Sequence, residues 1–437
     1  MTPNDPRALL ARAPMSAPQI AVIAIAVALN GLDGFDVLAI AFASPGIAAE
    51  WGIDRAILGI VLPMEMIGMG IGSIVLGTFA DKFGRRPIAL GCLVIMAAGM
   101  FMASTVRDLY SLCAWRVLTG LGIGGMLATT NALAAEFASD ARRTLAVSWM
   151  AIGYPIGAVI LGWCASELLE THDWRAIFRF GAAATAAMIP IVWFLVPESV
   201  HWLARVQPRG ALEKINRALL RLRHSTVAEL PPREPLTHTL SLTELFTPAL
   251  LPLTIVLALS YFLHLATFYY ILKWVPKIVV DMGFAAPLAG KVLVWANLGG
   301  ALGGAVFGLI ATRVTLKSLT MVAMLLGGIM VIVFGRGQTD LTSLAVVCAI
   351  TGFFTNSGIV GLYAMLAHYF PTHLRATGTG FVIGVGRGGA ALGPMLAGFL
   401  FQSGMALQAV SIVMACGSFL ALLALLLLRA QPPGPRH

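Results

Sequence analysis

Charged side chains are scarce in this sequence. Asp, Glu, Lys and Arg make up 11% of its 437 residues, whereas a soluble domain carries about 25%. Hydrophobic residues reach 58%, and the mean hydropathy is +0.87. So few charges cannot cover the apolar surface of a water-soluble fold, which excludes an ordinary globular protein and indicates a chain that folds in lipid.

Cysteine is rare as well, and the sequence lacks the short motifs of several enzyme classes. The five cysteines lie inside apolar stretches without the spacing of metal ligands or of a disulfide framework, so we expect small buried side chains there. The motifs HExxH, GxSxG and the phosphate-binding GxxxxGK are all missing. We therefore expect neither an enzyme nor an ATP-driven pump, and no metal or other cofactor.

Long apolar runs recur along the chain. A bilayer core about 30 Å thick needs about 20 apolar residues per helix, so each run is long enough to cross it once. The first run is too long for a cleavable signal peptide and lacks a small-residue cleavage site. The pattern predicts an all-α integral membrane protein with twelve transmembrane helices, at residues 19–45, 57–80, 87–105, 110–134, 144–167, 175–197, 249–275, 285–311, 316–335, 341–366, 377–401 and 405–428.

A single long polar segment divides these helices into two sets of six. It runs from Glu198 to Phe246, is rich in arginine and includes a proline-containing stretch near its end. We therefore expect an N-terminal bundle at residues 1–197, a linker at 198–247 and a C-terminal bundle at 248–437. Residues 211–223 have the pattern of a short amphipathic helix that lies on the membrane surface.

Basic residues are distributed unevenly between the two sides of this topology. With the N-terminus in the cytoplasm, the outer loops contain only Arg55, Arg107, Arg175, Lys277, Lys291 and Arg336. Most other basic residues fall in the inner loops and tails, as the positive-inside rule requires. Both termini are therefore expected in the cytoplasm. The net charge of +9 reflects this topology, and no nucleic-acid partner is expected.

The two halves of the chain resemble each other. The segment from Gly77 to Lys82 aligns with the segment from Gly308 to Arg313, and Thr119-Gly120 aligns with Thr351-Gly352 at nearly the same offset. Several matches at one offset indicate a duplicated six-helix unit. This is the architecture of many secondary transporters, whose substrate site lies near the bilayer midplane between the repeats.

Four features of the sequence together resemble the major facilitator superfamily of membrane transporters. One is the run Gly77-Thr-Phe-Ala-Asp81-Lys-Phe-Gly84-Arg85-Arg86-Pro87 after the second span, and another is the glycine-rich stretch that follows Arg116. In addition, Pro197-Glu198-Ser199 closes the sixth span, and twelve spans flank a central loop. The resemblance covers the whole chain and implies two pseudo-symmetric six-helix bundles that work by alternating access.

Three further motifs resemble a narrower group, the aromatic acid:proton symporters. They are Asp33-Gly34-Phe35-Asp36, Gly153-Tyr154-Pro155-Ile156-Gly157, and Gly386-Arg387-Gly388-Gly389 with Gly393-Pro394. That family imports benzoate-like and hydroxybenzoate-like anions into bacteria. The resemblance therefore implies a small aromatic carboxylate as substrate, the proton as coupling ion and the bacterial inner membrane as location. We also expect a monomer.

Ionisable residues inside the spans are candidates for function, because each costs at least about 2.5 kcal/mol at a helix centre. Asp36, Glu65 and Arg116 are expected at a similar depth. Asp33 lies one helical turn deeper, on the same face as Asp36. We interpret the four as a proton-coupling cluster in which protonation of a carboxylate follows substrate binding. The alternative is a static ion pair that holds the first, second and fourth helices together.

Arg387 is the main candidate for binding the carboxylate of a substrate. Its guanidinium is a permanently charged, planar fork, the surrounding glycines allow close approach, and its place in the span is near the midplane. Tyr154 is expected at the equivalent depth in the first half. An arginine that caps helix carbonyl groups is the alternative for Arg387.

His264 is a further candidate, either for proton handling or for a hydrogen bond to a phenol or carboxylate. A satisfied interior histidine is the alternative. Five other side chains fall at comparable depth and could stack on or orient a ring, although packing is the more common role of each: Tyr261, Phe268, Trp295, Asn297 and Asn356. Lys273 lies near the outer end of its span and is expected to extend to the membrane surface.

The loop signature after the second span predicts a conformational gate. Its charged residues could form a network that locks the cytoplasmic side and is broken and remade as the carrier alternates. The second half has Thr312 in place of the aspartate, so its lock is expected to be weaker or different. The residues of this gate are Gly77, Asp81, Gly84, Arg85, Arg86, Glu136 and Arg142.

Other functions fit the same fold. A carrier of another organic anion, such as a muconate-like or nicotinate-like acid, is one alternative, and a membrane ligand sensor that does not transport is another. Export by proton antiport is the main rival within transport. Drug export is disfavoured, because the fifth span carries Tyr154-Pro155 where such exporters usually have a glycine-rich signature. A midplane arginine also disfavours cationic drugs.

Overall fold

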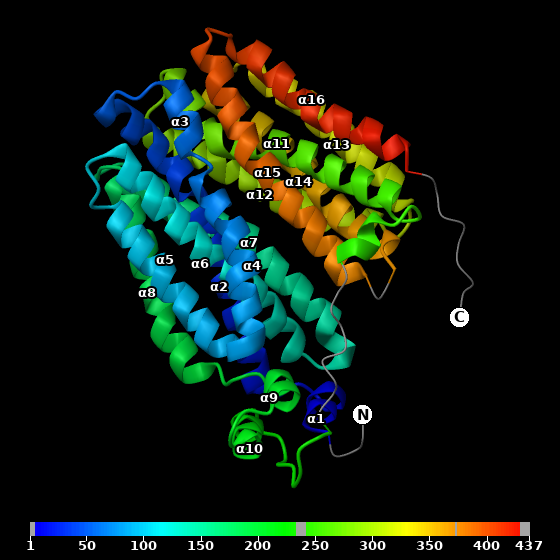
Figure 1. The fold of residues 1–437 in the computed structure, drawn as a ribbon. Coiled ribbons are helices and arrows are strands. Elements are labelled where there is room, and N and C mark those ends of the chain that lie inside the picture. The colour runs from blue at the N-terminus through cyan, green and yellow to red at the C-terminus, as the bar shows by residue number, and fades with distance from the viewer. Residues whose placement is uncertain (1–4, 233–241, 372–373, 429–437) are drawn as a thin grey trace. The chain divides into compact units, whose positions relative to one another are not determined.

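The computed structural model describes residues 5–232, 242–371 and 374–428, and every regular element within these ranges is a helix (Figure 1). Within these ranges, twelve segments are long and apolar enough to cross a bilayer, which confirms the twelve spans predicted from the sequence. The second span consists of two helices, α3 and α4. The elements are α1 (Pro6–Arg12), α2 (Ala17–Trp51), α3 (Arg55–Val61), α4 (Met64–Phe83), α5 (Arg85–Ala103), α6 (Leu109–Glu136), η1 (Asp140–Arg142), α7 (Arg143–Leu168), α8 (Arg175–Leu195), α9 (Val200–Val206), α10 (Ala211–Arg221), η2 (Leu242–Phe246), α11 (Leu251–Asp281), α12 (Ala286–Ile310), α13 (Leu316–Gly335), α14 (Leu341–Tyr369), α15 (Arg375–Gln402) and α16 (Leu407–Leu426).

Short-range sequence signals fix several helix starts. Asp54, Asp108 and Asp340 precede α3, α6 and α14. Each accepts a hydrogen bond from the backbone N–H of the third residue beyond it, at 2.7, 2.8 and 2.9 Å respectively. These bonds lower the pKa of Asp108 and Asp340, so both carboxylates stay ionised at neutral pH.

The chain packs into two compact units. The first comprises Met1–Ala43 and Met64–Thr237, and the second comprises Ser44–Pro63 and His238–His437. The end of α2 and the whole of α3 therefore pack with the second unit, although they belong to the first half of the sequence. Pro45 inside α2 and Pro63 between α3 and α4 lie at the two ends of this segment. Because proline has no N–H to donate, a helix is weakened at these points.

The helices pair in the same pattern within each unit. In the first unit α4 and α5 both pack against α6, and in the second α12 and α13 both pack against α14. Likewise, α5 packs against α8 and α13 packs against α16. The two units thus repeat one arrangement of helices, as the internal repeat of the sequence predicts.

Glycines allow the closest helix contacts in the first unit. A Cβ atom at Gly34 of α2 would lie 2.2 Å from the carbonyl oxygen of Tyr154 on α7. One at Gly120 of α6 would lie 2.0 Å from the carbonyl oxygen of Glu65 on α4. No larger residue fits at such a distance, so these glycines let the helix backbones touch. The contacts fix the position of the acidic residues on α2 and α4.

Three short helices pack together outside the spans (Figure 1). α1 packs against α9, and α9 packs against α10. The amphipathic helix predicted at residues 211–223 is α10, whose apolar side chains Ala211, Ile215, Ala218 and Leu219 are buried. The expectation that this face lies on the membrane is wrong, because protein covers it. Asn216 holds the segment after α10 through two hydrogen bonds of 2.9 Å to the backbone of Val227.

Candidate functional site

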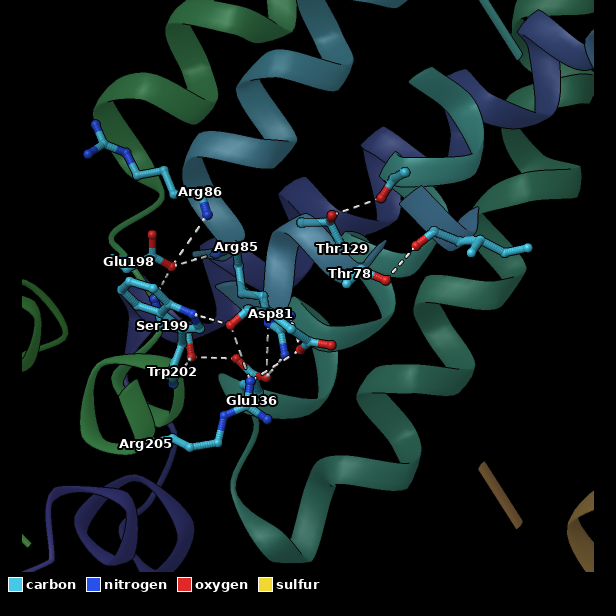
Figure 2. A network of polar contacts seen from close by, with 12 residues as sticks. Thr78, Asp81, Arg85, Arg86, Thr129, Glu136, Glu198, Ser199, Trp202 and Arg205 are labelled. Carbon is cyan, nitrogen blue, oxygen red and sulfur yellow. Dashed lines mark hydrogen bonds and ion pairs between the residues drawn. The ribbon is translucent and has the colours of Figure 1, made fainter. Parts of the chain in front are cut away.

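A charged network lies where α4, α5, α6 and α9 meet in the first unit (Figure 2). Arg85 at its centre reaches Asp81 with Nη1 at 2.7 Å and Glu136 with Nη2 at 3.1 Å. The Arg85 and Glu136 side chains are 11% and 18% exposed, so solvent screens this ion pair less than it screens surface pairs, whereas Asp81 is 57% exposed. A Cβ at Gly77, one turn before Asp81, would lie 3.4 Å from the Ala128 Cβ on α6, which is an ordinary contact, so the packing there does not require glycine. The structure thus brings the central residues of the predicted gate together.

Glu198 ties this network to the segment before α9 (Figure 2). Its Oε1 accepts hydrogen bonds from the backbone N–H groups of Arg85 at 2.8 Å, Ser199 at 2.9 Å and Arg86 at 3.4 Å. Burial outweighs these bonds and raises the pKa of Glu198. Gly84 makes room for the carboxylate, because a Cβ there would lie 2.3 Å from Glu198 Oε2. Its φ of 109° also requires glycine.

Three residues at α9 also belong to the network, although the sequence did not predict them as gate residues. Ser199 donates its hydroxyl to Glu136. Trp202 donates its indole N–H to the backbone oxygen of Asp81 at 2.9 Å, and Arg205 reaches the carboxylate of the same residue at 3.3 Å. The Pro197-Glu198-Ser199 motif was the signal that could have pointed to this part of the network, but the sequence alone gave the motif no role in the gate.

Two predicted gate residues stand apart from the ion pairs. Arg142 ends η1 with an exposed side chain, and no ion pair among the described residues includes it. Its neighbour Arg143 forms the local pair, with Asp140 at 2.8 Å. Arg86 meets the network through its backbone, while its guanidinium lies over the ring of Trp193 and donates to that residue's carbonyl oxygen. Arg142 is therefore outside the network in this structure, and its role in the gate stays a prediction.

A titratable histidine lies beside the network. His201 on α9 is close to the carboxylates of Glu136 and Asp5 and to the guanidinium groups of Arg7 and Arg143. Burial lowers the pKa of His201, so the neutral imidazole is favoured in the folded protein. Burial also acts to raise the pKa of Asp5, but the hydrogen bonds from Arg7, 2.8 Å away, lower it overall.

The four candidate proton-coupling residues lie on three helices of the first unit, and all four are buried. Asp36, Glu65 and Arg116 are 0% exposed, and Asp33 is 1% exposed. Arg116 Nη2 donates to the backbone oxygen of Asp36 at 2.7 Å and lies 3.5 Å from Glu65 Oε2. Its guanidinium also lies over the ring of Phe178, 5.5 Å from the ring centre. The structure therefore brings Asp36, Glu65 and Arg116 together.

The carboxyl group of Asp36 has an unusual environment. Neither of its oxygens has a hydrogen-bond partner among the described residues, because Arg116 bonds the backbone oxygen instead. Gly181 on α8 provides the space that this carboxyl faces, since a Cβ there would lie 3.3 Å from Asp36 Oδ1. A buried carboxylate without hydrogen bonds is costly to keep charged, whereas the neutral acid costs much less. Such a group can take up and release a proton.

In the second unit, Arg387 on α15 lies near Tyr261 on α11, which in turn bonds Tyr363 on α14. Arg387 is near enough to act electrostatically on Tyr261, whose hydroxyl donates to that of Tyr363 at 2.9 Å. Gly386 allows this approach, because a Cβ there would lie 2.1 Å from the Tyr261 ring. Tyr363 was not predicted, since no motif surrounds it. The group has the chemistry to bind a carboxylate and to hydrogen-bond a ring hydroxyl.

His264 has both ring nitrogens occupied. Nε2 lies 2.8 Å from the backbone oxygen of Thr355 on α14, and Nδ1 lies 2.9 Å from the hydroxyl of Ser418 on α16. A carbonyl oxygen only accepts, so Nε2 carries the proton and Nδ1 accepts from Ser418. The side chain is fully buried. This geometry favours the satisfied interior histidine over a ligand or a proton carrier.

The polar candidates on α12 and α14 are engaged with the backbone. Asn356 donates to the backbone oxygen of Gly300 at 2.7 Å and so links α14 to α12. Asn297 donates to a carbonyl of its own helix at 2.9 Å. Trp295 is 43% exposed and therefore presents its ring outside the packed core of the unit. Each amide uses one of its N–H groups in these bonds.

Two aromatic candidates and one lysine complete the predicted set. Phe268 packs edge-on against Tyr269, with 5.3 Å between ring centres. Tyr154 belongs to the first unit, at the contact between α7 and α2. Lys273 is 0% exposed, so the expectation that it extends to the membrane surface is wrong. Depth along a helix did not reveal the direction in which this side chain points.

Comparison with known proteins adds to this geometry. The Major Facilitator Superfamily model matches residues 23–339 and 257–437. A gallate transporter of Pseudomonas putida is 29% identical over 98% of this chain and 97% of its own length. A 4-hydroxybenzoate transporter of the same species, PcaK, is 27% identical over 89% of this chain and 88% of its own. The inward-open structure of the xylose transporter XylE from E. coli covers 93% of this chain and 95% of its own, with a TM-score of 0.72 and 17% identity, which is a likeness of fold alone.

Proposed function

The chain belongs to the major facilitator superfamily, and from this premise we propose that it imports an aromatic carboxylate together with protons. Relatives named as transporters of gallate and of 4-hydroxybenzoate, both aromatic carboxylates, support this substrate class. The proposed location is the bacterial inner membrane, with both termini in the cytoplasm and the protein working as a monomer. The twelve apolar segments support a multi-pass topology.

The buried carboxyl of Asp36 is the observation that carries the coupling part of the proposal. In the proposed cycle this group enters the protonated state when it is open to the outer side, which removes a charge from the interior. It releases the proton when Arg116 turns from the Asp36 backbone oxygen and from Glu65 toward the carboxylate, because a nearby cation favours the ionised form. Arg116 therefore serves as the switch and Asp36 as the proton carrier.

Arg387 is the proposed partner of the substrate carboxylate. Its fork can bond both carboxylate oxygens in one plane. The hydroxyl groups of Tyr261 and Tyr363 form a chain that can extend to a ring hydroxyl of the substrate. Tyr363 is 40% exposed and Tyr261 is 3% exposed, so Tyr363 is the more accessible of the two.

The network around Arg85 is the proposed gate of the first unit. Its ion pairs to Asp81 and Glu136 hold the ends of α4, α5 and α6 together, and Glu198 adds the segment before α9. We propose that these contacts form in one state of the cycle and weaken in the other. They bias the alternation without touching the substrate.

Uptake by the purified protein in liposomes tests the proposal. Labelled gallate, 4-hydroxybenzoate and benzoate are offered under an inward proton gradient. We expect accumulation above the level reached by passive weak-acid diffusion, and we expect an uncoupler to abolish it. If the wild-type protein accumulates none of the acids, the proposed substrate class is wrong.

Asp36→Asn tests the coupling step separately. This variant should lose gradient-driven accumulation but retain exchange of labelled for unlabelled substrate, because exchange moves no net proton. Asp108→Asn removes the same charge at an exposed helix cap and should accumulate substrate like the wild type. Full accumulation by Asp36→Asn would remove this residue from the coupling scheme.

A further inference from the structure

A pocket opens in the second unit where α3 begins, α11 ends and α16 begins. Its volume is about 360 Å³, within the range of about 300–1,000 Å³ that is usual for small-molecule sites. Arg55, Trp274, Asp281, Phe401 and Met405 are among its lining residues. None of these residues belongs to the proposed substrate site or gate. In the topology proposed above, this end of the unit faces the outside.

Arg55 and Asp281 are the charged residues of the pocket lining. Arg55 Nη2 lies 3.0 Å from Asp281 Oδ2, and Lys277 pairs with the other oxygen of the same carboxylate. Two cations thus share one anion. The Arg55 side chain is 44% exposed, so an anion from solvent can reach it. Asp281 would keep Lys277 as its partner if Arg55 turned to another carboxylate.

Aromatic side chains form the wall behind this charge. Arg55 Cζ lies 5.5 Å from the centre of the Phe401 ring. That ring packs against Trp274, with 5.0 Å between the ring centres. A flat ring that bears a carboxylate complements this arrangement, because its charge matches Arg55 and its apolar body matches Phe401 and Met405.

The pocket is connected to the helix that carries Arg387. Trp274 donates its indole N–H to the backbone oxygen of Pro394 at 3.0 Å, about two turns beyond Arg387 on α15. α3, which Arg55 begins, packs directly on the same helix, since a Cβ at Gly59 would lie 2.9 Å from the Gly398 Cα. A ligand in the pocket therefore contacts α11 and α3, the two helices that pack against α15 near its outer end.

We propose that this pocket is an outer capture site for aromatic carboxylates, in which the substrate carboxylate takes the place of Asp281 at Arg55. This inference rests on the proposed function, from which it takes the substrate class and the outward orientation. The step is an exchange of ion pairs: Arg55 passes from Asp281 to the substrate, and Lys277 stays on Asp281. Capture concentrates the substrate at the outer end and lowers the KM for uptake.

Uptake of labelled 4-hydroxybenzoate in liposomes tests the site with variants of opposite effect. Arg55→Gln should raise KM about fivefold, as expected for loss of a partly exposed ion pair, with a smaller effect on the maximal rate. Asp281→Asn should lower KM, because it removes the competing carboxylate. Arg107→Gln changes an exposed outer-loop arginine that does not line the pocket and should leave KM unchanged.

The outcomes separate this inference from the proposed function. If wild-type uptake is intact and neither Arg55→Gln nor Asp281→Asn changes KM, the capture site is wrong and the proposed function stands. If the wild-type protein takes up no aromatic acid, the proposed function fails, and the capture site fails with it.

A labelling experiment gives a second measurement that does not depend on the folding of Arg55→Gln. Met405→Cys puts a thiol in the pocket lining for a membrane-impermeant maleimide, with the unsubstituted protein as background. We expect 4-hydroxybenzoate to slow this labelling but not that of Thr105→Cys, an exposed position in another loop. The protection should persist when Arg387→Gln is added, because the pocket is a separate site. Labelling of Met405→Cys at the same rate with and without the acid contradicts the proposal.

Discussion

Replacing Gly84 by alanine tests how tightly the network holds the Glu198 carboxylate. The backbone at Gly84 has φ 109° and ψ 159°, a conformation that costs another residue about 1–3 kcal/mol. The new Cβ would also lie 2.3 Å from Glu198 Oε2. The carboxylate would have to move, although its other oxygen accepts from three backbone N–H groups.

The expected loss of stability follows from these two effects together. A hydrogen bond to a charged group contributes about 1.5–3 kcal/mol, and the carboxylate can shift without breaking all three bonds. With the backbone strain included, we expect Gly84→Ala to reduce the free energy of unfolding by about 3–5 kcal/mol.

Gly91→Ala, inside the helix that Gly84 precedes, is the matched control. A Cβ at Gly91 meets nothing within 4 Å, and alanine is favoured over glycine inside a helix by about 1 kcal/mol. Thermal unfolding of both purified variants in one detergent measures the difference. Gly84→Ala should melt well below the wild type, whereas Gly91→Ala should melt at the same temperature or higher. Equal melting temperatures for the two variants would refute the reasoning, since neither the backbone conformation nor the contact with Glu198 would then resist alanine.

Two histidines give further predictions. Burial lowers the pKa of His201 below its ordinary value of 6.5, so the stability gained from the neutral ring is present above pH 6.5 and is lost as the pH falls below it. Melting temperatures measured from about pH 5 to 8 should therefore decline less on the acid side in His201→Gln than in the wild type, and an identical decline would argue against this role. His264→Ala leaves the Ser418 hydroxyl and the Thr355 carbonyl without their partner and should cost about 2–4 kcal/mol of stability while leaving the KM for substrate unchanged. A raised KM at unchanged stability would return His264 to the substrate site.

The spans and part of the gate could be predicted because their signals are local. Bilayer thickness sets the length of each apolar run. Asp81 and Arg85 belong to one short motif, and they pair across the break between α4 and α5 at Gly84. The place of Glu198 could not be predicted in this way. Its bond to the Arg85 backbone joins positions 113 residues apart and depends on how α9 packs.

Depth in the membrane could be estimated from the sequence, but the direction of a side chain could not. Lys273 near the end of a span could either extend to the surface or turn inward, and the structure buries it. His264 has the depth of a site residue, yet two other helices supply partners for both of its nitrogens. The partners of His264 leave no sequence pattern near the residue itself.

Residues 44–63 precede the central loop by more than a hundred positions, yet they pack as part of the second unit. Gly59 lies against Gly398 of α15, and Arg55 is paired with Asp281 of α11. The two halves are therefore not interchangeable modules. If the gene were divided at the central loop, the second protein would lack residues 44–63. The face of α15 that carries Gly398 would then be uncovered. Because residues 44–63 complete the packing of the second unit, the two halves have to be expressed as one chain, even though their helices repeat.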